Sequence, residues 1–245
     1  MSWFEAVVAG LRDETPSART LVLDVPGWPG HLPGQHVDVR LTAPDGYTAA
    51  RSYSIASASA GTHLELTVDR LSDGEVSPYL TQVVEVGDPL DLMGPLGGWF
   101  VWRPDAGRPV QLLGGGSGVV PLMAMARTHA RLPDPPAMRL LYSVRELGAV
   151  LYERELADLR DRNDGVDVDL VYTRRGPAPG VVVGRVSAET LAERTWPAAE
   201  EPDCFVCGPT GFVEHVADLL VRAGHAPARI RTERFGPTTG PRPSE

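Results

Sequence analysis

The residues best suited to chemistry in this chain lie close together in the stretch RSYSIAS, residues 51–57. Arg51 offers a planar guanidinium, the best bidentate partner for a phosphate group. Side chains alternate along a strand, so Arg51 and Tyr53 share one face and Ser54 points to the other. The stretch is a candidate phosphate-binding strand, but it equally fits a strand with Tyr53 in a core and Arg51 in a surface ion pair.

A second candidate site is the glycine-rich stretch LLGGGSGVVP, residues 112–121. It lies between an expected buried strand and an expected helix, where a nucleotide pyrophosphate meets backbone N–H groups and the positive end of a helix. Because residue 119 is valine, the spacing is not that of GxGxxG, and Ser117 does not stand in a nucleophile elbow. The position favours nucleotide binding over a turn that uses glycine only for packing.

Two cysteines, Cys204 and Cys207, lie in the stretch CFVCG. They are too few to hold an iron–sulfur cluster on their own. A thioredoxin-like pair needs a helix N-terminus, and a zinc site needs further ligands. We therefore expect no metal site here and a Cys204 buried in its strand.

The composition excludes several classes of protein. The net charge of −9 disfavours nucleic acid and anionic membranes as main partners. All 23 basic residues are arginine, so there is no Walker-type or Schiff-base lysine. No apolar run reaches the roughly 18 residues of a membrane span, and the N-terminus does not read as a signal peptide. We expect a cytoplasmic protein.

The first hundred residues predict short strands in a nearly closed antiparallel β-barrel. The β-rich runs are separated by turn-forming stretches such as PGWPGHLPG, and they read RTLVLDV, QHVDVRL, RSYSIAS and HLELTVDR. One helix is expected to interrupt them, with Ser77 as its N-cap and Pro78 at its first position.

After a polar joint at residues 102–109, strands and helices alternate, which predicts a doubly wound parallel sheet. The expected strands are PVQLLGGG, MRLLYSV, VDVDLVY, CFVCG and ARIRTERF. The predicted organisation is a β-barrel domain at 1–104, an α/β domain at 105–236, and a flexible tail at 237–245.

The order of motifs RSYS, GEVS, GPLGGWF, GGGSGVVP and CGP resembles that of the ferredoxin–NADP reductase superfamily, in its short bacterial form. The resemblance covers about residues 3–236 and implies FAD in the barrel and NAD(P)H in the α/β domain. It implies that Arg51 binds a flavin phosphate, that Tyr53 packs on the isoalloxazine ring, and that Ser54 lies near flavin N5. The turn GEVS matches the family's pyrophosphate-binding turn and favours FAD over FMN; its residues are Gly74, Glu75, Val76 and Ser77.

In the second domain the resemblance implies a nicotinamide nucleotide against the glycine turn and the CGP turn. Cys207 matches the family cysteine beside nicotinamide C4 and flavin N5. The other residues implied for this nucleotide are Gly115, Gly116, Ser117, Ser143, Arg145, Thr173, Arg174, Gly208 and Pro209. Arginine at 145 fits the 2′-phosphate of NADPH, although relatives with arginine also use NADH. Phe235 matches an aromatic residue that covers the flavin, although ten residues follow it here, and Glu233 is a candidate for proton handling.

The implied reaction is hydride transfer from NAD(P)H to FAD, followed by electron transfer to a separate acceptor: a ferredoxin, a flavodoxin, or an oxygenase or oxidase component. The alternatives are a reductase of free flavin or another small acceptor, and a nucleotide-binding scaffold or sensor without turnover. Ser54 and Cys207 argue against the scaffold, because binding a nucleotide requires neither. We expect a monomer.

Overall fold

The N-terminal half forms an antiparallel sheet whose strands turn alternate apolar side chains inward. The computed structural model describes residues 3–104, 107–162, 165–181 and 183–236. Six strands pair in the order β4-β3-β6-β1-β2-β5. They are β1 (Trp3–Thr15), β2 (Ala18–Asp24), β3 (His36–Thr42), β4 (Thr48–Ser54), β5 (His63–Asp69) and β6 (Pro89–Leu96).

The sheet curls so that its two end strands nearly meet. A bridge joins Ile55, just after β4, to Leu66 in β5. The enclosed core includes Val37, Val39 and Leu92, each fully buried. The predicted barrel is therefore present, and β1 and β6 complete it beyond the strands predicted from the sequence.

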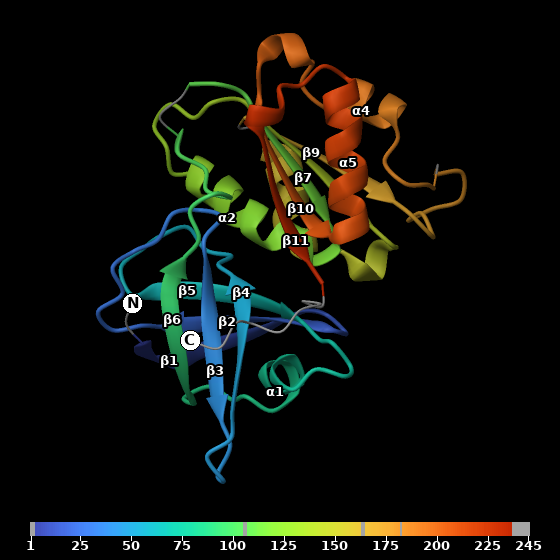
Figure 1. Cartoon of the computed structure of the whole chain (residues 1–245). Coiled ribbons are helices and arrows are strands. Elements are labelled where there is room, and N and C mark those ends of the chain that lie inside the picture. The colour runs from blue at the N-terminus through green and yellow to red at the C-terminus, as the bar shows by residue number, and fades with distance from the viewer. Residues whose placement is uncertain (1–2, 105–106, 163–164, 182, 237–245) are drawn as a thin grey trace.

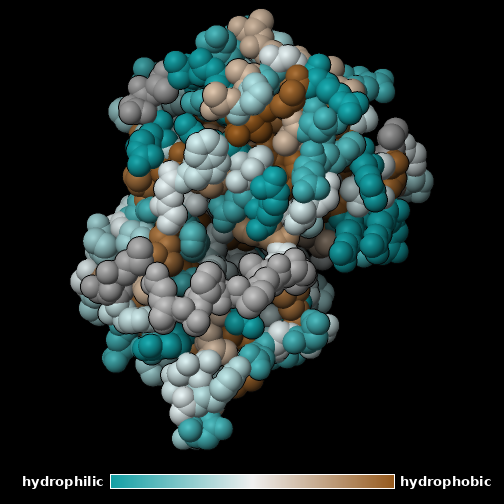
Figure 2. Space-filling view, in the orientation of Figure 1, coloured by the Kyte–Doolittle hydropathy of each residue, from teal (hydrophilic) through white to brown (hydrophobic). Residues whose placement is uncertain are grey.

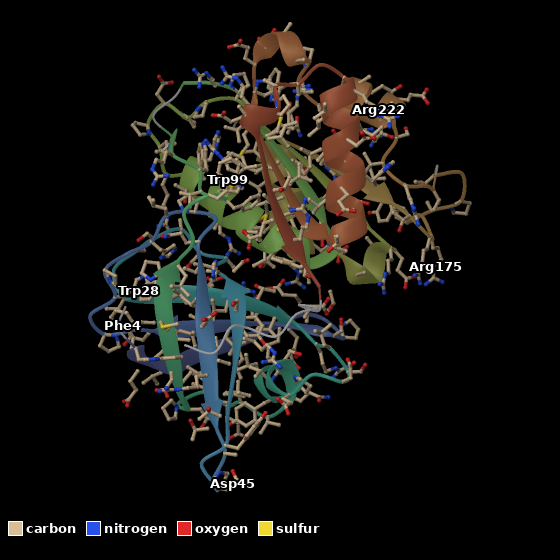
Figure 3. All side chains as sticks on the ribbon, viewed as in Figure 1. Phe4, Trp28, Asp45, Trp99, Arg175 and Arg222 are labelled. Atoms are coloured by element: carbon tan, nitrogen blue, oxygen red, sulfur yellow. The ribbon has the colours of Figure 1, made fainter. Side chains whose placement is uncertain are left out.

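Aromatic side chains pack beside this core. The rings of Phe4 and Trp28 meet edge to face with centroids 5.3 Å apart (Figure 3). The Trp28 indole donates to Nδ1 of His31, and the other ring nitrogen of His31 bonds the carbonyl of Ser57. These bonds attach the long β2–β3 loop to the barrel.

The helix of the barrel, α1 (Val76–Gln82), begins earlier than predicted. Glu75 is at the N-cap, and Ser77 and Pro78 lie inside the first turn. The Ser77 hydroxyl accepts a hydrogen bond from the N–H of Leu71 at 3.0 Å. The prediction of Ser77 as N-cap was wrong, because its hydroxyl holds the turn before the helix instead of capping the helix.

The C-terminal half is a parallel sheet with helices on both faces, as predicted. Its strands run in the order β11-β10-β7-β8-β9. They are β7 (Val110–Gly115), β8 (Met138–Val144), β9 (Val166–Tyr172), β10 (Asp203–Pro209) and β11 (Ile230–Phe235). On one face lie α2 (Val119–His129) and α3 (Glu153–Arg162); on the other lie α4 (Ala188–Arg194), which the sequence did not suggest, and α5 (Thr210–Arg222).

The segment between the two sheets is less polar than the sequence suggested. Phe100 and Trp102 are buried in the core of the α/β domain, and Trp102 stacks on His129. The change from one sheet to the other falls between β6 and β7, while the predicted tail 237–245 lies outside the described residues.

On the face shown in Figure 2, hydrophilic residues are interspersed with hydrophobic ones over both domains. Among the helices in the described parts of the chain, none combines the length and the apolar character needed to cross a membrane.

Candidate functional site

The strand order of the parallel sheet reverses between β7 and β10. The chain runs outward from β7 through β8 to β9, then returns to place β10 on the other side of β7. Ligands of open α/β sheets bind at such a switch point, outside the carboxyl ends of the strands. Here those ends are Gly115 on β7 and Pro209 on β10.

Glycine is required at two places in this turn. Gly116 has φ +55, a backbone conformation that disfavours other residues. A Cβ on Gly118 would lie 2.1 Å from the carbonyl oxygen of Cys207. Gly118 therefore allows the chain that enters α2 to approach β10, which closes the base of the site.

A cleft of about 790 Å³ opens at this edge of the sheet, between the two domains. The α/β side supplies the glycine turn, the ends of β8 and β9, and the start of α5. Of the residues predicted to hold the nicotinamide nucleotide, the cleft is lined by Gly115, Gly116, Ser117, Ser143, Arg145, Thr173, Arg174 and Pro209. The structure thus gathers residues that lie nearly a hundred positions apart in the sequence.

Three arginines give the cleft its positive charge. Arg145, Arg174 and Arg185 all line it and are exposed. In the described parts of the chain, no carboxylate or carbonyl engages their guanidinium groups. The backbone N–H of Arg174 donates to the carbonyl of Arg145 at 3.0 Å, which holds the two loops together. Unpaired guanidinium groups at such an edge suit phosphate oxygens.

Cys207 does not line the cleft. It is fully buried, in the core under α2, and its neighbour Gly208 also lies outside the cleft lining. Burial, reinforced by the nearby Glu233 carboxylate, raises the pKa of the Cys207 thiol well above its usual range. The thiol is therefore neutral, and in this conformation it has no direct access to solvent.

Glu233 lies on β11 directly opposite Cys207 on β10. Its carboxylate is partly buried, and burial raises its pKa to about 7. Across the described ranges, no hydrogen bond or ion pair engages this carboxylate. The next register pairs lead to Phe235, which pairs with Pro209 and packs on the α/β core. In Figure 1 this end of β11 points toward the barrel.

On β4 of the barrel, Arg51 forms no surface ion pair with the described residues. The Arg51 guanidinium is exposed and donates only to the carbonyl of Ala50, with no carboxylate partner among the described residues. Tyr53 packs against the barrel core, and burial raises its pKa to about 12. Ser54 is buried on the opposite side of the strand. The exposed guanidinium of Arg51 is suited to a phosphate group, and the half-buried ring of Tyr53 is suited to a flat ring system. FAD carries both.

The turn before α1 lies close to the tip of the β3–β4 hairpin. The Tyr47 hydroxyl donates to the Glu75 carboxylate, at 3.1 Å to the nearer oxygen. Val76 and Ser77 are buried, while Gly74 and Glu75 remain at the surface. The GEVS turn is thus linked to the tip of the hairpin whose second strand, β4, carries Arg51 and Tyr53, a contact that the sequence did not reveal.

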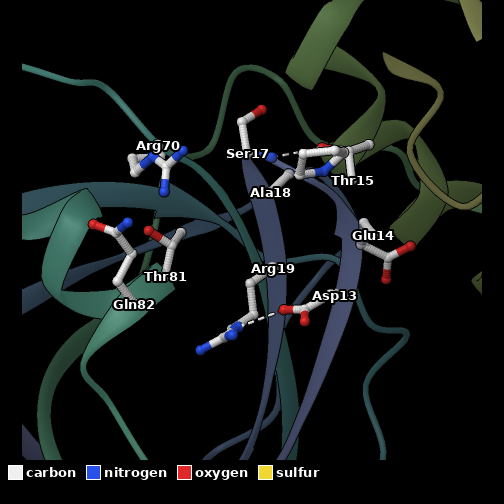
Figure 4. Close-up of a pocket in the computed structure, with 10 residues that line it drawn as sticks. Asp13, Glu14, Thr15, Ser17, Ala18, Arg19, Arg70, Thr81 and Gln82 are labelled. Atoms are coloured by element: carbon white, nitrogen blue, oxygen red, sulfur yellow. Dashed lines mark hydrogen bonds and ion pairs between the residues drawn. The ribbon is translucent and has the colours of Figure 1, made fainter. Parts of the chain in front are cut away.

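A polar hollow of about 590 Å³ lies on the other side of the β1–β2 turn (Figure 4). It is lined by charges of both signs, and its Arg19 pairs with Asp13 at 2.7 Å. It shares Thr15, Pro16 and Ser17 with the cleft, but no residue of the parallel sheet lines it. These features favour the interdomain cleft over this hollow as the nucleotide site.

Sequence reasoning missed the barrel wall of the cleft. This wall consists of Thr15, Pro16 and Ser17, in the β1–β2 turn, and of Asp69, which accepts a hydrogen bond from the Ser17 hydroxyl at 2.8 Å. The residue types at positions 15–17 indicate a turn, but no feature of the neighbouring sequence indicates that this turn lies beside the other domain. Arg185 was missed because it follows no expected strand.

Comparison with known proteins agrees with this geometry. Residues 12–101 match the family model of an oxidoreductase FAD-binding domain, and residues 112–218 match that of an oxidoreductase NAD-binding domain. The chain is 32% identical over 214 residues to a flavohemoprotein of Vibrio cholerae, which covers 84% of this chain and 52% of that protein. It is 32% identical over 209 residues to the glycine betaine monooxygenase reductase subunit of Chromohalobacter salexigens, covering 84% and 56%.

A solved structure matches over almost its whole length. This is the FAD/NAD-binding domain of nitric oxide dioxygenase from Vibrio cholerae, with a TM-score of 0.84, 30% identity, and coverage of 96% of this chain and 99% of that one. By contrast, the chain spans only a little over half the length of the two curated relatives.

The fold and the site define an oxidoreductase with one FAD-binding and one NAD-binding domain. The chain belongs to the ferredoxin–NADP reductase superfamily. Its cofactors are FAD and a nicotinamide nucleotide.

Proposed function

We propose that this protein takes a hydride from NAD(P)H and passes the electrons to a separate redox protein, such as an oxygenase component or a ferredoxin. The observation that carries the proposal is the cleft at the β7–β10 switch point. Both domains wall this cleft, and it is lined by three arginines whose guanidinium groups have no partner among the described residues. A nucleotide held there reaches from the phosphate-binding edge of the sheet to the barrel that binds the flavin.

Within this proposal, the residues of the chain bind and orient the two ligands. When bound, FAD supplies the redox chemistry, because it accepts a hydride and releases electrons. Arg51 and the turn at Gly74–Ser77 hold its phosphates, and Tyr53 packs on its ring. Ser54 is buried on the other side of β4, so its place at the ring edge requires the local twist of the backbone to bring it round. The Gly115–Ser117 turn holds the dinucleotide phosphates at the start of α2.

Arg145 and Arg174 stand in this proposal where the 2′-phosphate of NADPH binds, with Ser143 and Thr173 beside them. The support is their exposure and their lack of carboxylate partners among the described residues. Glu233 is the candidate for proton handling, because its pKa of about 7 allows both protonation states near neutral pH. Cys207, opposite Glu233, packs behind the nicotinamide position.

The proposed acceptor is a protein because one relative is a monooxygenase reductase subunit. The chain itself has two cysteines, both buried and reduced. These two cysteines are too few to hold an iron–sulfur cluster on their own. Reduction of free flavin is the second candidate, and acceptor assays separate the two.

The test is an anaerobic visible spectrum of the FAD-loaded protein, titrated with NADPH and separately with NADH. Bleaching of the flavin by either nucleotide is the expected result, and the more efficient donor identifies the preferred nucleotide. A bound flavin that neither nucleotide bleaches would refute the proposal. Steady-state reduction of a purified ferredoxin against free FMN then separates a protein acceptor from a small one.

A further inference from the structure

Five hydrogen-bonding groups form a closed ring across the domain interface, centred on Tyr152 at the start of α3. The Tyr152 hydroxyl donates to the Thr67 hydroxyl at 2.5 Å, and the Thr67 and Thr20 hydroxyls lie 2.7 Å apart. The Thr20 hydroxyl donates to the Glu14 carboxylate at 2.7 Å. The other oxygen of that carboxylate accepts from the backbone N–H of Tyr152 at 3.2 Å. The ring joins one residue of the α/β domain to three strands of the barrel.

The donor order of this ring is fixed by its chemistry. A hydroxyl has one proton, and that of Thr20 goes to Glu14, so Thr67 must donate to Thr20. All protons therefore point from Tyr152 toward the carboxylate. Such chains polarise one another and strengthen in a dry environment. This environment is dry, because Tyr152, Thr20 and Thr67 are each at most 6% exposed and the Glu14 side chain is 7% exposed.

Tyr152 has an unusual backbone at this point. Its φ of +58 lies in the left-handed region, which is uncommon for a residue other than glycine. Glycine would relieve this strain but would remove the side chain that crosses the interface. Strain of this kind persists where the surrounding structure holds it in place, and it concentrates at functional sites.

Two members of the ring, Glu14 and Tyr152, are each adjacent in sequence to a wall of the dinucleotide cleft. Glu14 precedes Thr15, the first residue of the barrel wall. Tyr152 follows Leu151, the last residue that lines the cleft within the segment 143–151 of the α/β wall. A change in the Tyr152–Thr67 or Tyr152–Glu14 distance therefore moves one wall of the cleft relative to the other.

A second contact holds the domains together nearby. Arg127 of α2 donates to Glu155 of α3, to Glu65 of β5 and to the carbonyl of Ala56, and it lies over the Tyr152 ring. This ion cluster ties the same pair of domains, so loss of one ring hydroxyl need not separate them. A ring variant therefore reports on the fit of the cleft rather than on domain separation.

We propose that the ring Tyr152–Thr67–Thr20–Glu14 is a positioning element that sets the width of the dinucleotide cleft and so aligns the nicotinamide ring with the flavin. The inference rests on the proposed function, because the alignment matters only if the cleft holds NAD(P)H. It assigns to Tyr152 and Thr67 a role in hydride transfer, although neither touches a ligand.

The test uses Tyr152→Phe, Thr67→Val and the double variant in the FAD-loaded protein. Stopped-flow bleaching of the flavin by saturating NADPH or NADH gives the hydride-transfer rate. Titration of the FAD-loaded protein with NADP⁺ gives the dissociation constant of that nucleotide. The long-wavelength absorbance of a nicotinamide ring stacked on the flavin reports alignment directly. We expect each single variant to lower the rate on the order of tenfold, since a displacement of about 1 Å can cost about a hundredfold. The stacking absorbance should weaken with it, while flavin content stays unchanged.

The double variant should be no slower than the slower single variant, because both substitutions break the same ring. Thr195→Val is the matched control: this buried threonine bonds Leu191 inside the α/β domain, away from the cleft, and its loss should leave rate and absorbance unchanged. Three results would each overturn the positioning role: multiplied losses of rate in the double variant, unaltered rates in the single variants, or an equal loss in Thr195→Val.

If neither nucleotide bleaches the flavin of the wild-type protein, the proposed function fails instead. The NADP⁺ dissociation constants of the variants then test the ring alone, and unchanged values would overturn it.

Discussion

The partly buried carboxylate of Glu233 leads to a quantitative prediction about stability and pH. Its folded-state pKa is about 7, against an ordinary value of 4.5, and the cause is burial. Between these two values the folded state binds more protons than the unfolded state, so stability falls as the pH rises through this window. The Glu233→Gln substitution replaces the carboxylate with a neutral group of the same size and should remove this loss.

The magnitude follows from the size of the shift. At about 1.36 kcal/mol per pKa unit, ionising Glu233 in the folded protein costs roughly 3 kcal/mol at pH 8 and less than about 1 kcal/mol at pH 5. Because the side chain is only partly buried, solvent screening reduces the cost at pH 8 to about 1.5–3 kcal/mol. Glu233→Gln should therefore stabilise the protein by that amount at pH 8 and by little at pH 5.

Thermal unfolding of the FAD-free protein at pH 5 and pH 8 measures this difference. For a chain of this size, the gain at pH 8 corresponds to a rise in Tm of several degrees, at about 2–4 °C per kcal/mol. Glu214→Gln, at an exposed glutamate of α5, is the matched control and should show no pH-dependent gain. An equal Tm change at both pH values, or a loss of stability at pH 8, would show that Glu233 is not held in an unfavourable charged state.

Three further substitutions test the proposed roles in the site. Arg51→Ala should weaken FAD binding by roughly 1.5–3 kcal/mol through the loss of charged hydrogen bonds; an unchanged FAD dissociation constant would mean that Arg51 does not hold the flavin phosphate. Cys207→Ala should slow flavin reduction by NAD(P)H while FAD stays bound, and an unaltered stopped-flow rate would make this buried cysteine purely structural. Arg145→Ala should raise KM for NADPH but not for NADH, and equal effects on both nucleotides would contradict contact with the 2′-phosphate.

The sequence was sufficient for most of the elements, though not for β1, β6 or α4, and for one wall of the site. Alternating apolar residues identify strands such as β3, and the glycine-rich turn after β7 marks where a nucleotide approaches a helix. In an alternating strand–helix pattern, the carboxyl ends of parallel strands meet at one edge. Gly116 and Thr173 follow β7 and β9, and Ser143 lies near the end of β8, so this edge brings them together. Local periodicity and a general rule of topology indicate the edge, and the resemblance to the ferredoxin–NADP reductase superfamily assigns Ser143 and Thr173 to the nucleotide.

Side-chain environments required the tertiary structure. The sequence identified Cys207 and Glu233 as candidates, but it did not show that β10 and β11 place them opposite each other, nor that burial keeps the thiol neutral. The same holds for Ser77, whose hydroxyl bonds Leu71 instead of capping α1. Burial and the choice of hydrogen-bond partner depend on neighbours from other elements, so the residue type alone leaves them undetermined.

The junction of the two domains shows this limit most clearly. Tyr152 bonds Thr67, 85 positions away, and Glu14, 138 positions away. The barrel turn at Thr15–Ser17 becomes a wall of the nucleotide cleft through the same docking. The sequence determined which chemical groups this protein has and which fold presents them. Only the docking of the two domains decided which groups meet, because contacts between distant segments leave no periodic signal in either segment.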